Sequence, residues 1–313
     1  MDTVMENEMN LFGVPDVPFQ MLTSLPLTPA HWVEIARHAP WQMTRMNLNT
    51  FARHGVFKDE TLVRTVADRL RNPEAIRRAK VFPYQLMAAY MNVGSEIPAA
   101  VTEALQDAME VAISNVPKFS DAGVAVCVDV SGSMSSRVTG NRGSASSTMT
   151  CVDVAALMAA CVLRTNPHAV IVPFECKVRQ LHLNPRDTVL TNAQKLAGLC
   201  GGGTNCSCAL NYLNKRKFQG DVVIYVSDNE SWMDTINSSE TATMTQWEVF
   251  RERNPHAKLV NIDIQPYRTT QTPDRPEIAN IGGFSDTVFD FIADFVKNDD
   301  PAHWVDEIGT IPL

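Results

Sequence analysis

The chain has 313 residues, enough for about two domains at the usual size of roughly 150 residues each. Apolar residues make up 45% of it and charged residues 20%, a balance that indicates a globular protein and excludes a disordered one. No apolar run reaches the roughly 18 residues that a membrane-spanning helix needs, and the N-terminus is acidic and polar, unlike a signal peptide. We therefore expect a cytoplasmic protein that makes no membrane contact.

The net charge of −8 is unevenly distributed along the chain. Residues 1–30 hold four acidic residues and no Lys or Arg, which gives −4, and residues 31–91 hold ten basic and five acidic residues, which gives +5. The remainder holds seventeen basic and twenty-six acidic residues, which gives −9. A basic segment in an acidic protein is either an anion-binding face or a solvated helical surface whose Lys and Arg stems cover apolar area.

The seven cysteines are odd in number and lie mostly in apolar segments, so we expect reduced thiols and no disulfide framework. Cys206 and Cys208 are one residue apart, as in some zinc sites. No second Cys or His pair stands at metal-ligand spacing to complete four ligands, and zinc is therefore disfavoured.

The N-terminal third is predicted to be helical after an irregular, proline-containing lead-in over residues 1–27. A helix is predicted over HWVEIARHA, ending at Pro40, and a second helix begins near Trp41. Two further apolar stripes have helical spacing: Val63, Val66, Ala67 and Leu70, and then Val101, Ala104, Leu105, Ala108, Met109 and Ala112. Short antiparallel helices of this kind resemble an α-solenoid, and we assign the helical region to residues 28–118.

The pattern changes near Pro117 to apolar strands that alternate with helices. Residues 123–130 form a continuous β-branched run, as expected of a strand buried on both faces of a parallel sheet. Further strands are predicted over 169–174, 221–227 and 258–264, and helices after the first strand, near 206–218, near 241–253 and over the apolar positions from Phe284 to Phe295. This alternation predicts a doubly wound α/β domain over residues 119–300, followed by a C-terminal tail over 301–313.

Five oxygen-bearing side chains follow predicted strands or a glycine loop: Asp129, Ser131, Ser133, Thr204 and Asp228. The first three lie on the loop that leaves the first strand, Thr204 follows three glycines, and Asp228 follows the strand over 221–227. Ligands of open α/β sheets bind at the carboxyl ends of the strands, so these loops are expected to converge. The alternative is that Asp129 and Ser133 only cap the turn that follows them.

Two carboxylates and three hydroxyls are hard ligands, which favour a cation such as Mg²⁺, Ca²⁺ or Mn²⁺ over zinc or copper. Mg²⁺ fits best because it keeps several waters in an octahedral shell. Those positions are open to water or to the carboxylate of a partner.

DVSGS, the downstream Thr204 and Asp228 resemble the metal-ion-dependent adhesion site (MIDAS) of von Willebrand A domains, over roughly residues 120–300. WQMTRMNLNTFARHGVF (residues 41–57), VDVSGSM, GGGTNC and SDNESW resemble the Ro autoantigen, or TROVE-domain, family. Its members join a ring of HEAT-like helical repeats to a von Willebrand A domain. The resemblance implies a ribonucleoprotein component that binds small Y-type or misfolded RNA in RNA quality control and catalyses no reaction.

The implied fold class is α plus α/β, a short HEAT-like region followed by a Rossmann-like A domain. Only about a hundred residues precede the A domain, too few to close a ring. We therefore expect a truncated or split member, or assembly with another chain that completes the ring.

The candidates for RNA contact all lie in the basic segment: Arg45, Arg53, His54, Lys58, Arg77, Arg78 and Lys80. Such cations contact phosphates, whereas unpaired bases stack on aromatic or guanidinium planes; solvated charge and a structural His54 are the alternatives.

Two other functions stay open. One is a metal-dependent protein-interaction module that does not bind RNA by itself, in which the cation captures an Asp or Glu of a partner. The other is a metal-dependent hydrolase, because Mg²⁺ with two carboxylates also occurs in phosphoryl transfer. It is disfavoured because the three loops hold no His, and Glu230 is the only extra candidate for a general base. GGGTN lacks the Lys of a P-loop, and SGSM is not a nucleophile elbow.

Overall fold

The computed structural model describes residues 19–22, 25–121, 123–139, 148–228, 241–266, 272–285 and 287–298. The chain divides into two compact units, residues 1–115 and 116–313. Residues 1–18 of the predicted lead-in (1–27), the predicted tail (301–313) and Glu230 lie outside the described residues. Within these ranges, no helix combines the length and the apolar character that crossing a membrane would require.

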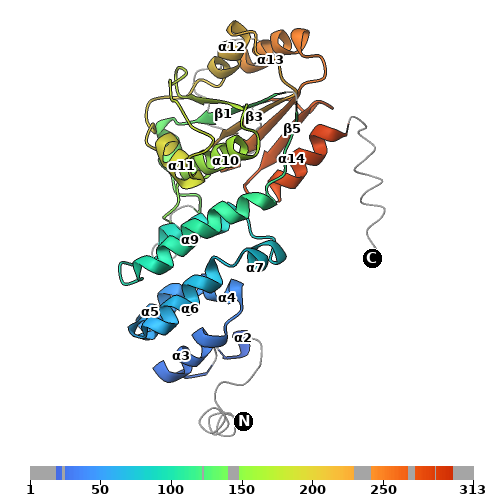
Figure 1. Ribbon diagram of the computed structural model, residues 1–313. Helices are drawn as coiled ribbons and strands as arrows, with labels where there is room; N and C mark the ends of the chain where they lie inside the picture. The colour runs from blue at the N-terminus through green and yellow to red at the C-terminus, as the bar shows by residue number, and fades with distance from the viewer. Residues whose placement is uncertain are drawn as a thin grey trace. The chain divides into compact units, whose positions relative to one another are not determined.

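The first unit is helical in the part that the structure describes (Figure 1). Its α-helices are α2 (Phe19–Leu22), α3 (Pro29–His38), α4 (Trp41–Met46), α5 (Leu48–Arg53), α6 (Glu60–Leu70), α7 (Pro73–Arg78), α8 (Pro83–Asn92) and α9 (Ala99–Ala112). Two short 3₁₀ helices are η1 (Val56–Lys58) and η2 (Ile113–Asn115). Side-chain oxygens cap three of the helices, with Thr28 before α3, Asp59 before α6 and Asn72 before α7.

The apolar stripes of this unit form its core. Every residue of the stripe predicted from Val101 to Ala112 is buried in α9, which packs against α6 and α8. In α6 the register differs slightly, because Leu62 is buried and Val63 is only half-buried. A second cluster joins α3 to α5, where Trp32 lies edge-on to Phe51 with ring centroids 6.3 Å apart.

The second unit contains a parallel sheet of five strands in the order β2-β1-β3-β4-β5. The strands are β1 (Val124–Asp129), β2 (Val170–Phe174), β3 (Val222–Ser227), β4 (Lys258–Asp263) and β5 (Ile278–Gly282). The first four were predicted from their continuous apolar runs. The edge strand β5 was not, because its sequence IANIG contains Asn and Gly, which are uncommon in strands.

Helices cover both faces of this sheet, which confirms the doubly wound α/β prediction. They are α10 (Cys151–Thr165), α11 (Val189–Ala197), α12 (Ser207–Lys215), α13 (Ala242–Arg253) and α14 (Val288–Lys297), with the short 3₁₀ helix η3 (Gly132–Ser135). In Figure 1, α12 and α13 lie on one face and α10, α11 and α14 on the other. The helix α11 lies outside the helical stretches that the sequence predicted.

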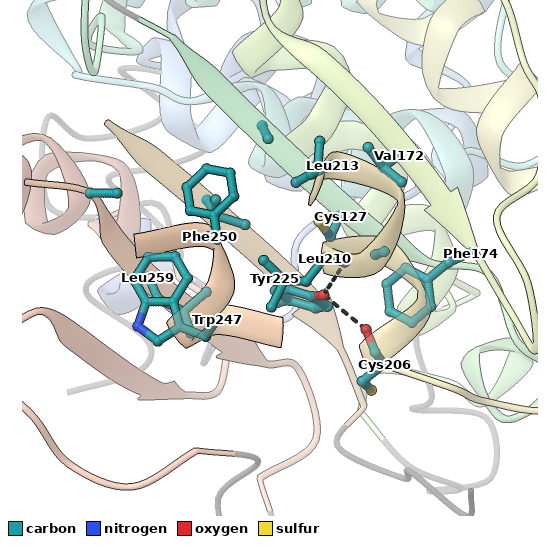
Figure 2. Close-up of a cluster of buried hydrophobic side chains, with 14 of the residues drawn as sticks. Cys127, Val172, Phe174, Cys206, Leu210, Leu213, Tyr225, Trp247, Phe250 and Leu259 are labelled. Atoms are coloured by element: carbon teal, nitrogen blue, oxygen red, sulfur yellow. Dashed lines mark hydrogen bonds between the residues drawn. The ribbon is translucent and has the colours of Figure 1, made fainter. Parts of the chain in front are cut away.

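The core between the sheet and the pair α12 and α13 is aromatic (Figure 2). Trp247 stacks on Phe250 of the same helix with centroids 5.6 Å apart, and Phe174 meets Tyr225 edge-on at 5.7 Å. These side chains are buried, and burial of each large aromatic group stabilises the fold by roughly 1.5–3 kcal/mol relative to an exposed position. The core holds the carboxyl ends of β1, β2 and β3 in place below the loops that follow them.

Candidate metal site at the carboxyl edge of the sheet

The strand order places the two predicted carboxylates at neighbouring strand ends. β1 lies between β2 and β3, which is the point where the chain connections change direction and where open α/β sheets bind ligands. The Ser227 hydroxyl at the end of β3 donates to Oδ2 of Asp129 at 2.8 Å. Asp129 and Asp228 are both buried, and the structure therefore brings the first and third predicted loops together.

The DVSGS loop folds back on its own carboxylate. The backbone N–H of Ser131 donates to Oδ1 of Asp129 at 2.8 Å, and the hydroxyls of Ser131 and Ser133 lie 3.2 Å apart. The loop then continues into η3, whose Met134 is buried. The side-chain oxygens of Asp129, Ser131 and Ser133 thus lie in one cluster.

The glycine loop is joined to the DVSGS loop by two backbone hydrogen bonds. The Gly201 N–H donates to the carbonyl of Val130 at 2.8 Å, and the Gly132 N–H donates to the carbonyl of Gly202 at 2.9 Å. Thr204, two residues further along, is buried with 2% exposure. The structure therefore places the loop of Thr204 beside the loop of Asp129.

Glu175, which was not among the predicted site residues, supports the glycine loop. It directly follows β2, its carbonyl accepts from the Asn205 N–H at 2.9 Å, and its Oε2 accepts from the Cys176 N–H at 2.7 Å. A Cβ on Gly202 would lie 2.6 Å from this Oε2, and Gly202 has a φ of +84°. Glycine meets both conditions without strain, whereas any other residue would require the Glu175 carboxylate to move. The sequence signal was an acidic residue just after a strand, as for Asp228.

Tyr225 fixes the beginning of α12, immediately after the glycine loop (Figure 2). Its hydroxyl donates to the carbonyl of Cys206 at 2.8 Å and accepts from the N–H of Leu210 at 3.2 Å. In α10 the corresponding backbone groups bond directly, from Val154 N–H to Thr150 carbonyl at 3.3 Å. The phenol is therefore inserted into the first turn of α12.

Burial and mutual repulsion make the ionised forms of the acidic groups at this edge less favourable, which raises the pKa of two of them. Burial, and to a smaller extent the Asp228 carboxylate, raise the pKa of Asp129 to about 6, although hydrogen bonds from Ser131 and Ser227 oppose the shift. Burial and Asp228 also raise the pKa of Asp263, at the end of β4, to about 7. A bound cation would stabilise the charged form of all three groups, so this donor set fits a hard divalent ion.

The types of side chain at the edge of the sheet limit which ion could bind there. Among the described residues, no three His, Cys, Asp or Glu side chains form a group that could hold a metal by themselves. Any cation at the edge therefore depends on hydroxyl oxygens as well, which favours Mg²⁺ over zinc. Cys206 is buried in the core and Cys208 is half-buried, and neither forms a disulfide.

The predicted RNA contacts fall into two groups in the helical unit. Arg45 donates to the carbonyl of Gln85 at 2.9 Å, and His54 stacks on Trp32 with centroids 5.0 Å apart, so both side chains take part in packing. The other five are exposed: Arg53, Lys58, Arg77, Arg78 and Lys80. The exposed residues belong to two separate segments, one at the end of α5 and in η1, and one in and after α7.

Comparison with known proteins identifies the family. Residues 124–296, more than half of the chain, match the sequence family described as Ro60 vWA domain. The chain belongs to the Ro, or TROVE, family. This Ro chain is 28% identical over 251 residues to the RNA-binding protein RO60 of Deinococcus radiodurans, a match that covers 76% of this chain and 46% of the relative. The RNA-binding protein RO60 of Caenorhabditis elegans is 25% identical over 251 residues, with 76% and 37% covered.

The crystal structure of the Ro (RSR) protein of Deinococcus radiodurans has the same fold. The similarity has a TM-score of 0.73 at 20% sequence identity and covers 96% of this chain and 60% of the solved one. The Ro chain thus combines a helical region with a von Willebrand A domain, as the sequence predicted, and the sheet has one strand more than the four that were predicted. It spans less than half the length of the two curated relatives.

Proposed function

We propose that this Ro chain binds RNA through its helical unit and holds a hard divalent cation at the carboxyl edge of its A domain. The observation that carries the RNA part is the family membership together with two relatives that are named RNA-binding proteins. Small non-coding or misfolded RNA is the proposed ligand class. The protein acts as a binding component and not as an enzyme.

The charges support this division of labour between the units. RNA carries one negative charge per nucleotide, and the five exposed cations of the helical unit face the solvent, where phosphate can reach them. The edge of the A domain is acidic and would repel phosphate in the absence of a cation.

The proposed cation is Mg²⁺, held by the hydroxyls of Ser131, Ser133 and Thr204 and by the carboxylates of Asp129 and Asp228. When bound, it supplies a Lewis-acid position for an oxygen atom of a partner. The protein's own contribution is to keep the hydroxyl-bearing loops together through the backbone bonds between Val130, Gly132 and the glycine loop. The two serine hydroxyls are already 3.2 Å apart, within the span of one ion's coordination shell.

Fluorescence anisotropy tests the RNA proposal, with a duplex RNA that bears a single-stranded tail as the probe. We expect the logarithm of the binding constant to fall linearly with the logarithm of the salt concentration, by about 0.7–0.9 per phosphate contact. Replacing Arg77, Arg78 and Lys80 together by alanine should reduce that slope. The control is Arg64→Ala, an exposed arginine of α6 that pairs with Glu60 at 3.9 Å. Affinity that does not change with salt would contradict phosphate contact.

A second candidate is a metal-dependent protein-interaction module that does not bind RNA by itself. It is favoured by the concentration of buried polar groups at the sheet edge, whereas the basic residues are dispersed. In this case the cation would capture an Asp or Glu of a partner protein. The candidate predicts that EDTA and Asp129→Ala both abolish partner capture, and that the unsubstituted chain shows no salt-dependent RNA binding. RNA binding that persists in EDTA distinguishes the first proposal from this one.

A further inference from the structure

Asp263, which ends β4, lies in the same row of the sheet as Asp129. In the parallel register Asp129 pairs with Phe174, and Ser227 pairs with Asp263. The hydrogen bond from Ser227 to Asp129 joins the two pairs across β1 and β3. Neighbouring strands are about 4.8 Å apart, which places Asp263 roughly 10 Å from Asp129 along this row.

The side chains of this row share one face of the sheet. Side chains alternate along a strand, so Asp129 lies on the face of Cys127, Ser227 on that of Tyr225, and Asp263 on that of Leu259. All three of these apolar partners belong to the core beneath α12 and α13. Asp263 therefore ends its strand on the same side, and at the same edge, as the carboxylate that begins the DVSGS loop.

One carboxylate oxygen of Asp263 is buried without a hydrogen-bond donor among the described residues. The residue is only 5% exposed, and its Oδ1 is buried with no hydrogen-bond partner among the described residues. A buried carboxylate oxygen without a donor is costly unless a cation or an ordered water compensates it. The charge that acts on it is another carboxylate, Asp228, which makes its ionised form still less favourable.

We propose that Asp263 is a further residue of the cation site, a third carboxylate whose charge strengthens the binding of a divalent ion beside Asp129 and Asp228. This inference rests on the proposed cation site. Because the acidic residues do not form a ligand group by themselves in the described part of the chain, Asp263 acts on the ion through space or through a bridging water. At a separation near 10 Å and an effective dielectric constant of roughly 20–40, one charge changes the affinity for a divalent ion on the order of tenfold or more.

Titration calorimetry of the full chain with Mn²⁺ at constant pH and ionic strength tests the inference. We expect Asp263→Asn to weaken Mn²⁺ binding about tenfold and Asp129→Ala to abolish it. The matched control is Glu252→Gln, which removes one negative charge from an exposed position in the last turn of α13. That substitution should leave Mn²⁺ binding unchanged, since it changes only the net charge of the protein.

Two outcomes distinguish a failure of the role of Asp263 from a failure of the proposed cation site. Loss of binding in Asp129→Ala with unchanged binding in Asp263→Asn would overturn the role of Asp263 and leave the cation site standing. Absence of Mn²⁺ binding to the unsubstituted chain would overturn both.

Thermal melting in EDTA checks the fold: we expect Asp263→Asn to melt at or above the temperature of the unsubstituted chain, because it removes repulsion with Asp228. A lower melting temperature with undiminished Mn²⁺ affinity would indicate a purely structural role.

Discussion

The two units use charge in different ways. At the edge of the sheet, parallel strands β2, β1, β3 and β4 end in or lead directly into an acidic residue, and the fold buries each of these residues at that edge. In the helical unit, ten basic residues are spread over residues 31–91, and some are used for packing. Burying like charges is expensive, whereas leaving a charge in solvent is not. The acidic edge is therefore much stronger evidence for a binding site than the basic segment.

The largest effect that would test this contrast is expected for Asp129→Ala. Removing the carboxylate that Ser131 and Ser227 both contact should weaken Mg²⁺ or Mn²⁺ binding by more than about 100-fold. Equilibrium dialysis with Mn²⁺ measures this loss. RNA binding by the helical unit should not change at equal salt. A matching loss of RNA binding would show that the two units do not act separately.

Gly202→Ala tests whether the glycine loop depends on Glu175. The new Cβ would collide with the Glu175 carboxylate at a φ of +84°, so we expect a loss of stability measured by urea unfolding. Gly283→Ala is the matched control, because Gly283 has a φ of +83° and nothing within 4 Å of its Cβ position. The strain of the backbone alone costs roughly 1–2 kcal/mol. Gly202→Ala should cost about 1–3 kcal/mol more. Equal losses would indicate that Glu175 simply moves aside.

Thr204→Val tests whether the hydroxyl of the buried Thr204 takes part in the cation site. The substitution keeps the shape of the side chain and removes its hydroxyl oxygen. We expect about tenfold weaker Mn²⁺ binding, of the order seen when one supporting group of a metal site is removed. Thr204→Ser retains the hydroxyl and should restore most of the affinity. If valine and serine give the same affinity, Thr204 is only a packed residue.

The smallest effects are expected in the basic segment, where each cation contributes separately. Replacing Arg53 and Lys58 by alanine should lower the slope of RNA affinity against salt by about 0.7 for each phosphate that these two side chains neutralise. The same measurement on Arg77, Arg78 and Lys80 shows which of the two exposed groups lies on the RNA path. If neither set changes the slope, the basic segment is a solvated surface.

The sequence predicted those parts of the site that depend on spacing. DVSGS, the strand before it and Asp228 after β3 follow from the rule that ligands bind at the carboxyl ends of parallel strands. Glu175 was missed because its importance depends on its proximity to Gly202, and no sequence pattern reports such a proximity. Asp263 was read only as part of a strand, since the register that places it beside Ser227 exists only in the folded sheet.

The helical unit shows a different limit of prediction. Arg45 was grouped with the surface cations because its type and position fit a basic face. Its partner is a carbonyl forty residues away in α8, and such a pairing follows from tertiary packing rather than from local sequence. The edge strand β5 was missed for a similar reason, because the neighbour β4, and not its own composition, makes IANIG a strand.

The phenol of Tyr225 influences the position of the backbone that follows the glycine loop. Because its oxygen bridges the Cys206 carbonyl and the Leu210 N–H, the position of Cys206 depends on a side chain of the core as well as on the helix. A phenylalanine in its place would lack this oxygen, so we expect the Leu210 N–H to bond directly to the Cys206 carbonyl and the first turn of α12 to tighten. The buried hydroxyl of Tyr225 thus helps to position the backbone that links the glycine loop to α12.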